Sequence, residues 1–117
     1  MRFWDNMNVG GRLNLSISSG SKYEMQNLLS ADNAQAIQSL LFCLYNTSSS
    51  SLHVNSAQKI SGNAGTNSMG SLRIGANKTG IQRFNGKYQE AIFWDANHSS
   101  NRTGIESDIN GYFSIYT

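Results

Sequence analysis

The clearest indication of fold class is the succession Leu72-Arg73-Ile74-Gly75, Phe84-Asn85-Gly86-Lys87 and Tyr88-Gln89-Glu90-Ala91-Ile92-Phe93-Trp94 in the last third of the chain. The first segment predicts a strand that ends at a glycine, and the second predicts a turn. The third segment is apolar on both faces, which predicts a central strand with Trp94 in the core. This part of the chain is therefore expected to run strand, turn, strand.

A short helix is predicted to follow, because Ser99 or Ser100 can cap its first turn. Ile105, Ile109 and Tyr112 or Phe113 recur at helical spacing and predict the face that packs on the rest of the molecule. Gly111 is suited to the left-handed position that ends a helix. Residues 112–116 are expected to form a last short strand.

The N-terminal half contains further strand signals. Strict alternation over residues 12–18 predicts a half-buried strand, and residues 22–28 are expected to return as the second arm of a hairpin. Residues 30–36 are interpreted as a loop, with a capped helical turn as the alternative. The apolar run Ile37 to Tyr45 predicts a central strand covered on both sides, followed by a hairpin connection at residues 46–50.

A second hairpin is predicted from Ser51–Asn55 and Ala57–Ile60, with Asn55 carrying a positive φ in the turn. His53 falls on the strand face opposite Leu52 and Val54, so we expect it to point to solvent or to a partner. The glycine-rich residues 61–70 are expected to form an exposed loop, and Ser71–Gly75 the next strand.

Composition limits the possible functions of the chain. Its 117 residues are expected to form one domain, residues 1–117, and the nine basic and seven acidic residues are too evenly balanced for a nucleic-acid footprint. Cys43 is the one cysteine, so the sequence predicts no disulfide and no zinc cluster, and it reads as a small buried hydrophobe. No apolar run is long enough to predict membrane insertion.

The order of segments in the last third resembles the closing part of laminin-G-like, concanavalin A-type lectin/glucanase domains. Asn101–Glu106 and Tyr112–Tyr116 are most similar to versions found in bacteriophage structural proteins. The resemblance implies an all-β antiparallel sandwich, a jelly roll of concanavalin A-like type, with one short C-terminal helix. A complete domain of that family is longer, so the early strands are expected to be missing and their exposed edges to promote self-association.

The function implied by this resemblance is a non-catalytic structural and adhesion module of a virus particle. Two roles fit equally: receptor or glycan binding in a tail fibre or spike, and capsid decoration. The expected partners are other virion proteins, a second copy of the chain, or a cell-surface glycan. A glycoside hydrolase-like domain and a cellular laminin-G-like adhesion fragment are the alternatives.

Catalytic and metal-binding patterns were sought without success. Glu90 and Asp95 are five positions apart on the expected strand, so their side chains would point to opposite faces, unlike the paired carboxylates of sandwich glycosidases. The loop that binds calcium in related domains corresponds to residues 77–83, which carry two cations and no acid. Glu106 and Asp108 are interpreted as solvated helix charges. No enzyme activity and no cofactor are therefore predicted.

The predicted binding site lies in the same loop, because an exposed loop between strands is a common position for ligand contacts. The candidate residues are Asn77, Lys78, Gln82, Arg83 and Asn85.

Overall fold

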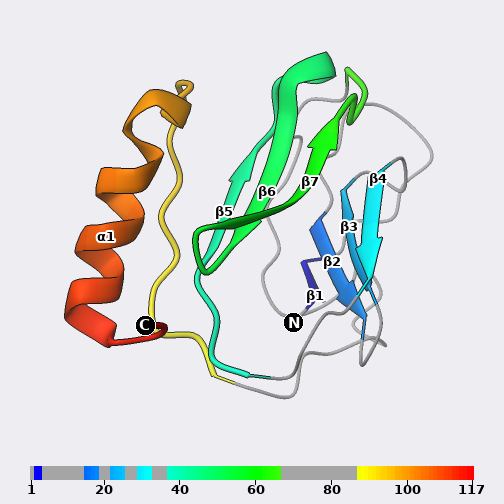
Figure 1. The fold of residues 1–117 in the computed structure, drawn as a ribbon. Helices are drawn as coiled ribbons and strands as arrows, with labels where there is room; N and C mark the ends of the chain where they lie inside the picture. Colours follow the sequence, from blue (N-terminus) through cyan, green and yellow to red (C-terminus); the bar gives the residue numbers. More distant parts are fainter. Residues whose placement is uncertain (1, 4–14, 19–21, 26–28, 33–36, 67–86) are drawn as a thin grey trace.

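A computed structural model describes residues 2–3, 15–18, 22–25, 29–32, 37–66 and 87–117 of the chain. The first four ranges are described by their backbone, and side chains are described for the other two. Within these ranges the chain forms two antiparallel sheets and one α-helix (Figure 1).

The first sheet is a meander of four short strands in sequence order. These are β1 (Arg2–Phe3), β2 (Leu15–Ser18), β3 (Lys22–Met25) and β4 (Leu29–Asp32). The predicted hairpin is confirmed where it is described, because Ser18 pairs with Lys22 and Leu15 with Met25. The loop expected at residues 30–36 and its helical alternative are both wrong over β4, which pairs along the edge of β3.

The second sheet contains β5 (Leu41–Leu44), β6 (Ser50–Val54) and β7 (Ala57–Gly62), again in sequence order. A single 3₁₀ turn, η1 (Thr47–Ser49), joins β5 to β6, so the predicted hairpin connection is confirmed. The strand predicted within residues 37–45 is also present but shorter. Its apolar run predicted a central strand, and that prediction is wrong. The strand lies at an edge of the three-stranded sheet.

The positive φ predicted for Asn55 in the turn between β6 and β7 is confirmed, and Ser56 also has a positive φ. Asn55 has φ 50° and Ser56 has φ 64°, and two successive positive values match the twist of a tight hairpin. Asn55 also clamps the chain before β5: its side-chain oxygen accepts from the Leu40 amide at 2.8 Å, and its own amide donates to the Leu40 carbonyl at 2.9 Å.

The two faces of the second sheet differ in chemistry. Leu52, Val54 and Ile60 are buried on one face. The register of β6 against β7 shifts between Leu52 and His53, so that Gln58 and not Lys59 lies opposite His53. Residues directly opposite each other share a face, so Ser51, His53, Gln58 and Ser61 form a polar row on the other side, next to Phe42 and Leu44 of β5, which lie opposite His53 and Ser51.

The loop predicted at residues 61–70 is partly replaced by sheet, because β7 continues to Gly62. Beyond it Ala64 is buried, and its amide donates to the Thr47 carbonyl at 3.0 Å. The start of the segment is thus packed against η1 and is not an open loop. Residues 67–70 and the predicted strand Ser71–Gly75 lie outside the described residues.

The predicted helix is confirmed as α1 (Arg102–Phe113), which follows a 3₁₀ turn, η2 (Ser99–Asn101). Its N-cap is Asn101 and neither of the two predicted serines. Ile105, Ile109 and Phe113 are partly buried as their spacing predicts, whereas Tyr112 is 82% exposed.

The end of α1 differs from the prediction. The helix passes through Gly111, and Ser114 takes the left-handed conformation with φ 52°. Asn110 then holds the tail: its side-chain oxygen accepts from the amides of Ile115 and Tyr116, and its side-chain nitrogen donates to the Tyr116 carbonyl. Residues 114–117 turn back along the helix end, so the predicted terminal strand is wrong.

The central strand predicted at Tyr88–Trp94 is also wrong. In Figure 1 this segment runs as an extended trace between α1 and the second sheet, without strand pairing among the described residues. Phe93 is 53% exposed and Trp94 43% exposed, so Trp94 is not a core residue. Its ring does contact Phe42 and His98, at centroid distances of 6.3 Å and 5.5 Å. Apolar composition predicted burial here, but residues 91–94 remain exposed.

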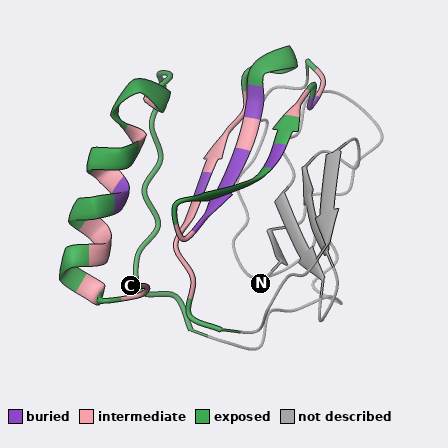
Figure 2. Cartoon of the chain, in the orientation of Figure 1, coloured by how far each residue is buried: buried purple, intermediate pink, exposed green. Residues whose placement is uncertain are grey.

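These findings overturn the expected all-β, concanavalin A-like jelly roll. A jelly roll requires Greek-key connections, whereas both described sheets keep their strands in sequence order. A helix of 12 residues covers one side of the β5–β7 sheet, and the buried positions in Figure 2 lie mainly on β6, β7 and the inner side of α1. The described part of the chain is therefore an α+β structure.

Gly111→Ala is predicted to raise the free energy of unfolding by about 0.5–1 kcal/mol, because glycine is a poor residue within a helix. A Cβ atom at this position would meet nothing within 4 Å, so no steric cost offsets the gain. Urea unfolding measures the change. An unchanged or lower stability would contradict the helix end described here, and Leu52→Ala, which opens a cavity in the core, is the destabilising control.

Candidate functional site

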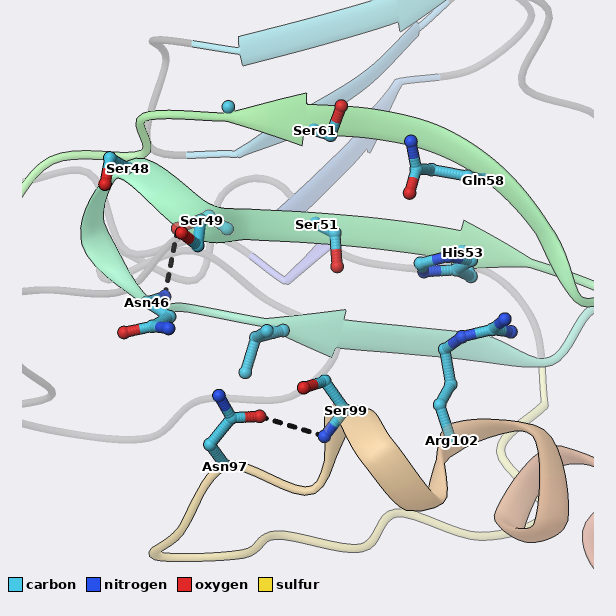
Figure 3. Close-up of a pocket in the computed structure, with 13 residues that line it drawn as sticks. Asn46, Ser48, Ser49, Ser51, His53, Gln58, Ser61, Asn97, Ser99 and Arg102 are labelled. Atoms are coloured by element: carbon cyan, nitrogen blue, oxygen red, sulfur yellow. Dashed lines mark hydrogen bonds between the residues drawn. The ribbon is translucent and has the colours of Figure 1, made fainter.

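An open groove of about 520 Å³ lies between the start of α1 and the face of the second sheet that carries the polar row on β6 and β7 (Figure 3). Its volume falls within the usual range of small-molecule sites. The strands and their connections supply Leu44, Asn46, Ser48, Ser49, Ser50, Ser51, His53, Gln58, Ser61 and Gly62. The segment that leads into α1 supplies Asn97, Ser99 and Arg102.

The rim near η1 is held by Ser50, whose side chain is buried. Its hydroxyl accepts from the Asn46 amide at 3.0 Å and donates to the Thr47 carbonyl at 2.9 Å. These two bonds satisfy both the donor and an acceptor site of the hydroxyl and fix the tight turn of η1. The exposed side chains of Ser48 and Ser49 then stand at one end of the groove (Figure 3).

The opposite wall is built by the residues before α1. The Asn97 side-chain oxygen accepts from the Ser99 amide at 2.9 Å, and the Asn101 amide donates to the His98 carbonyl at 2.9 Å. The resulting turn brings Ser99 close to β5, and Arg102 reaches from the first turn of α1 toward β6 (Figure 3).

A buried carboxylate fixes α1 against the sheet. Glu106 is 0% exposed, and its Oε2 atom accepts from the Ser56 hydroxyl at 3.1 Å and forms an ion pair with Arg102. The Tyr116 hydroxyl lies 2.9 Å from the Ser56 oxygen. Since the single Ser56 proton is given to Glu106, the Tyr116 hydroxyl donates to Ser56. Helix, hairpin turn and C-terminal tail therefore meet at one point, and the prediction that Glu106 is solvated is wrong.

His53 is the second buried polar residue of this interface. It lies opposite Leu52 and Val54 as predicted, but it is only 8% exposed, so the expectation that it points to solvent is wrong. Its Nδ1 atom has no hydrogen-bond partner among the described residues. Burial, together with the charge of Arg102, lowers the pKa of His53 below its ordinary value of 6.5, and the charge of Glu106 opposes this shift.

The lining is rich in hydroxyl and amide groups and contains one cation, Arg102, with no carboxylate among its described members. Glu90 and Asp95 are exposed outside it, as is Asp108, for which the predicted solvent exposure is confirmed. In the described ranges no three His, Cys, Asp or Glu side chains lie close enough together to hold a metal ion. The groove can therefore donate and accept hydrogen bonds, but its described lining offers no pair of acids.

The binding residues predicted from sequence, Asn77, Lys78, Gln82, Arg83 and Asn85, lie outside the described residues. Cys43 is described, and it is partly buried. Burial raises the pKa of its thiol to about 12, so the thiolate that a nucleophile needs is disfavoured. No helix in the described part of the chain has the length and apolar character needed to cross a bilayer.

Comparison with known proteins finds no matching family model, no similar curated protein and no similar solved structure.

The residues that organise the groove were missed from sequence. The spacing of Arg102 and Glu106, four positions apart on a predicted helix, was a usable signal for an ion pair. Glu106 also follows Ile105 on the packing face, which could have predicted its burial. Nothing local in the sequence links Ser56 to Glu106 or to Tyr116, because these contacts join residues 50 and 60 positions apart.

The folded protein is predicted to lose stability through His53 as the pH falls below about 6.5. The unfolded chain binds a proton at this residue more readily than the folded chain, whose pKa is lower. The loss starts below the unfolded-state value and is complete once the pH is below the folded-state pKa. Urea unfolding at pH 7.5 and pH 5.5 measures it, with His53→Gln expected to reduce the difference.

His98→Gln is the matched control, because it removes the other histidine of the chain and should leave most of the pH dependence in place. An NMR titration that gives His53 a pKa of 6.5 or higher would contradict its burial beside Arg102.

Proposed function

We propose that the chain is a non-catalytic binding module of a virus particle, and that its groove takes a hydroxyl-rich ligand such as a cell-surface glycan. The observation that carries the proposal is the polar row of Ser51, His53, Gln58 and Ser61 on one sheet face. Asn46 and Asn97 add amide groups at the groove walls.

The chemistry of the lining supports a saccharide ligand. Hydroxyl and amide side chains both donate and accept, and so do sugar hydroxyl groups. The groups that position the lining are held by other bonds, as the Ser50 hydroxyl and the Asn97 oxygen are. A groove with fixed walls binds with a smaller loss of conformational entropy than one whose walls must be ordered by the ligand.

The virion context rests on the resemblance of Asn101–Glu106 and Tyr112–Tyr116 to bacteriophage structural proteins. A role in assembly has separate support in Ile92, Phe93 and Trp94, three successive exposed apolar side chains. Exposed apolar patches commonly mark surfaces that contact other proteins. Self-association, or packing on a capsid or fibre protein, therefore remains the second proposed role.

A glycosidase role has weaker support. Retaining enzymes of that kind hold two carboxyl groups about 5–5.5 Å apart across the scissile bond. Glu106 is the buried acid near the groove, and its Oε2 atom is engaged by Ser56 and Arg102. We therefore propose binding without hydrolysis.

Gln58→Ala is predicted to weaken saccharide binding by roughly threefold to tenfold, the effect of losing one or more ligand hydrogen bonds. A glycan array identifies the ligand, and an NMR titration gives its dissociation constant. Gln89→Ala removes the same side chain at an exposed position outside the groove, where Gln38 is its hydrogen-bond partner, and should leave the constant unchanged. Absence of any saccharide binding, or release of reducing ends during incubation, would contradict the proposal.

A further inference from the structure

The groove is chemically uneven, because its only charged lining residue in the described part of the chain lies at one end. Arg102 stands there with His53 beside it (Figure 3), and the remaining described lining is neutral. The first turn of α1 contains no acidic residue, so no carboxylate from that turn competes for these nitrogen atoms.

Arg102 is oriented but not fully occupied. Its Nη1 atom is paired with Glu106 Oε2, and its side chain keeps 20% of its surface exposed. A guanidinium group carries five N–H donors in a planar fork, so the pairing with one carboxylate oxygen leaves donors that can face the groove. Glu106 itself is fully buried and does not line the groove. The carboxylate therefore holds Arg102 in place from behind.

His53 forms the wall of the groove beside Arg102. The residue is 8% exposed, and its Nδ1 atom is buried without a partner among the described residues, so this atom does not face the groove. The donors that a ligand oxygen can meet at this end are therefore those of the guanidinium group.

We propose that the groove selects an acidic saccharide, of the uronic-acid or sialic-acid class, whose carboxylate lies against Arg102. The inference rests on the proposed function, that the groove binds a saccharide, and adds the charge of the ligand. A guanidinium group matches a carboxylate in two parallel hydrogen bonds, which is a geometry that a neutral hydroxyl does not reproduce. The sugar hydroxyls would lie along Ser51, Gln58 and Ser61.

The pairing of Arg102 with Glu106 also predicts how the selectivity is achieved. The two charges cancel at long range, so the preference arises from short, directional bonds and not from a broad positive field. Binding should therefore depend only weakly on ionic strength, in contrast to a cluster of exposed lysine residues, whose attraction is screened by salt.

The test is an NMR titration of the full chain with saccharides that differ only in the acid. Suitable pairs are a glucuronate oligomer and its carboxyl-reduced form, a galacturonate oligomer and its carboxyl-reduced form, and sialyllactose and lactose. For at least one pair the acidic member should bind about tenfold more tightly, the expected effect of a charge-assisted bond. The amide signals of Ser51, His53, Gln58 and Arg102 should shift.

Arg102→Gln should abolish this preference, and Lys59→Gln is the matched control. Lys59 is exposed on β7 outside the groove. Each substitution removes one positive charge, but only Arg102→Gln removes the planar guanidinium donors from the groove. Because Arg102→Gln leaves Glu106 without its ion pair, Arg102→Lys serves as a second variant: it keeps the positive charge but loses the planar set of donors, and it should also reduce the preference. Thermal unfolding verifies that each variant folds.

The outcomes separate the two proposals. Equal binding of acidic and neutral members overturns this inference but leaves the saccharide site intact. Binding of neither member of any pair overturns both. Equal losses in Arg102→Gln and Lys59→Gln would also overturn the inference, because the preference would then follow net charge and not the geometry of the groove.

Discussion

The buried carboxylate of Glu106 is the interaction on which the arrangement of helix and sheet depends. An ionised group removed from water is tolerated only when it is paired and hydrogen-bonded. Here the ion pair comes from Arg102 on the same helix, and the hydrogen bond comes from Ser56 in the turn between β6 and β7. Removing either partner leaves a buried charge with less compensation. The contacts of Glu106 therefore fix the position of α1 against the sheet, and they also fix Arg102 at the groove.

The contacts of Glu106 also connect the C-terminal tail to the groove. Asn110 turns the tail back after α1, and this places the Tyr116 hydroxyl against Ser56. Ser56 can donate to Glu106 because Tyr116 satisfies its acceptor site. At the other end of the network, Glu106 holds Arg102 beside His53 at the groove. Turn geometry, tail conformation and the chemistry of the proposed site are thus connected through four side chains: Tyr116, Ser56, Glu106 and Arg102.

The sequence predicted local structure better than long-range packing. Alternation and turn chemistry located the β6–β7 hairpin and the positive φ of Asn55, because both depend on neighbouring residues. Helical spacing located α1. Tyr88–Trp94 was predicted to be a strand from its composition, but a strand also needs backbone pairing with a neighbouring strand, and that information is not local. The jelly-roll prediction failed for the same reason, since strand order is set by contacts between distant segments.

Prediction of the site was also limited to features that neighbouring residues determine. The face that carries His53 was predicted correctly from strand alternation, but the helix that covers it contributes Glu106 and Arg102 from about 50 positions away. The position of Ser56 between the two predicted strands indicates a turn residue, but it gives no sign that the hydroxyl bonds to both Glu106 and Tyr116. The binding residues predicted from sequence, Asn77, Lys78, Gln82, Arg83 and Asn85, lie outside the described residues.

The most direct test of this account is a double-mutant cycle on Ser56→Ala and Glu106→Ala, in which urea unfolding gives the stability of each variant. A cycle isolates the coupling between two residues from the separate cost of truncating each one. The account predicts a coupling free energy of about 1.5–3 kcal/mol, the usual value for a hydrogen bond to a charged group. Additive effects, with coupling below about 0.3 kcal/mol, would contradict the claim that this contact holds α1 on the sheet.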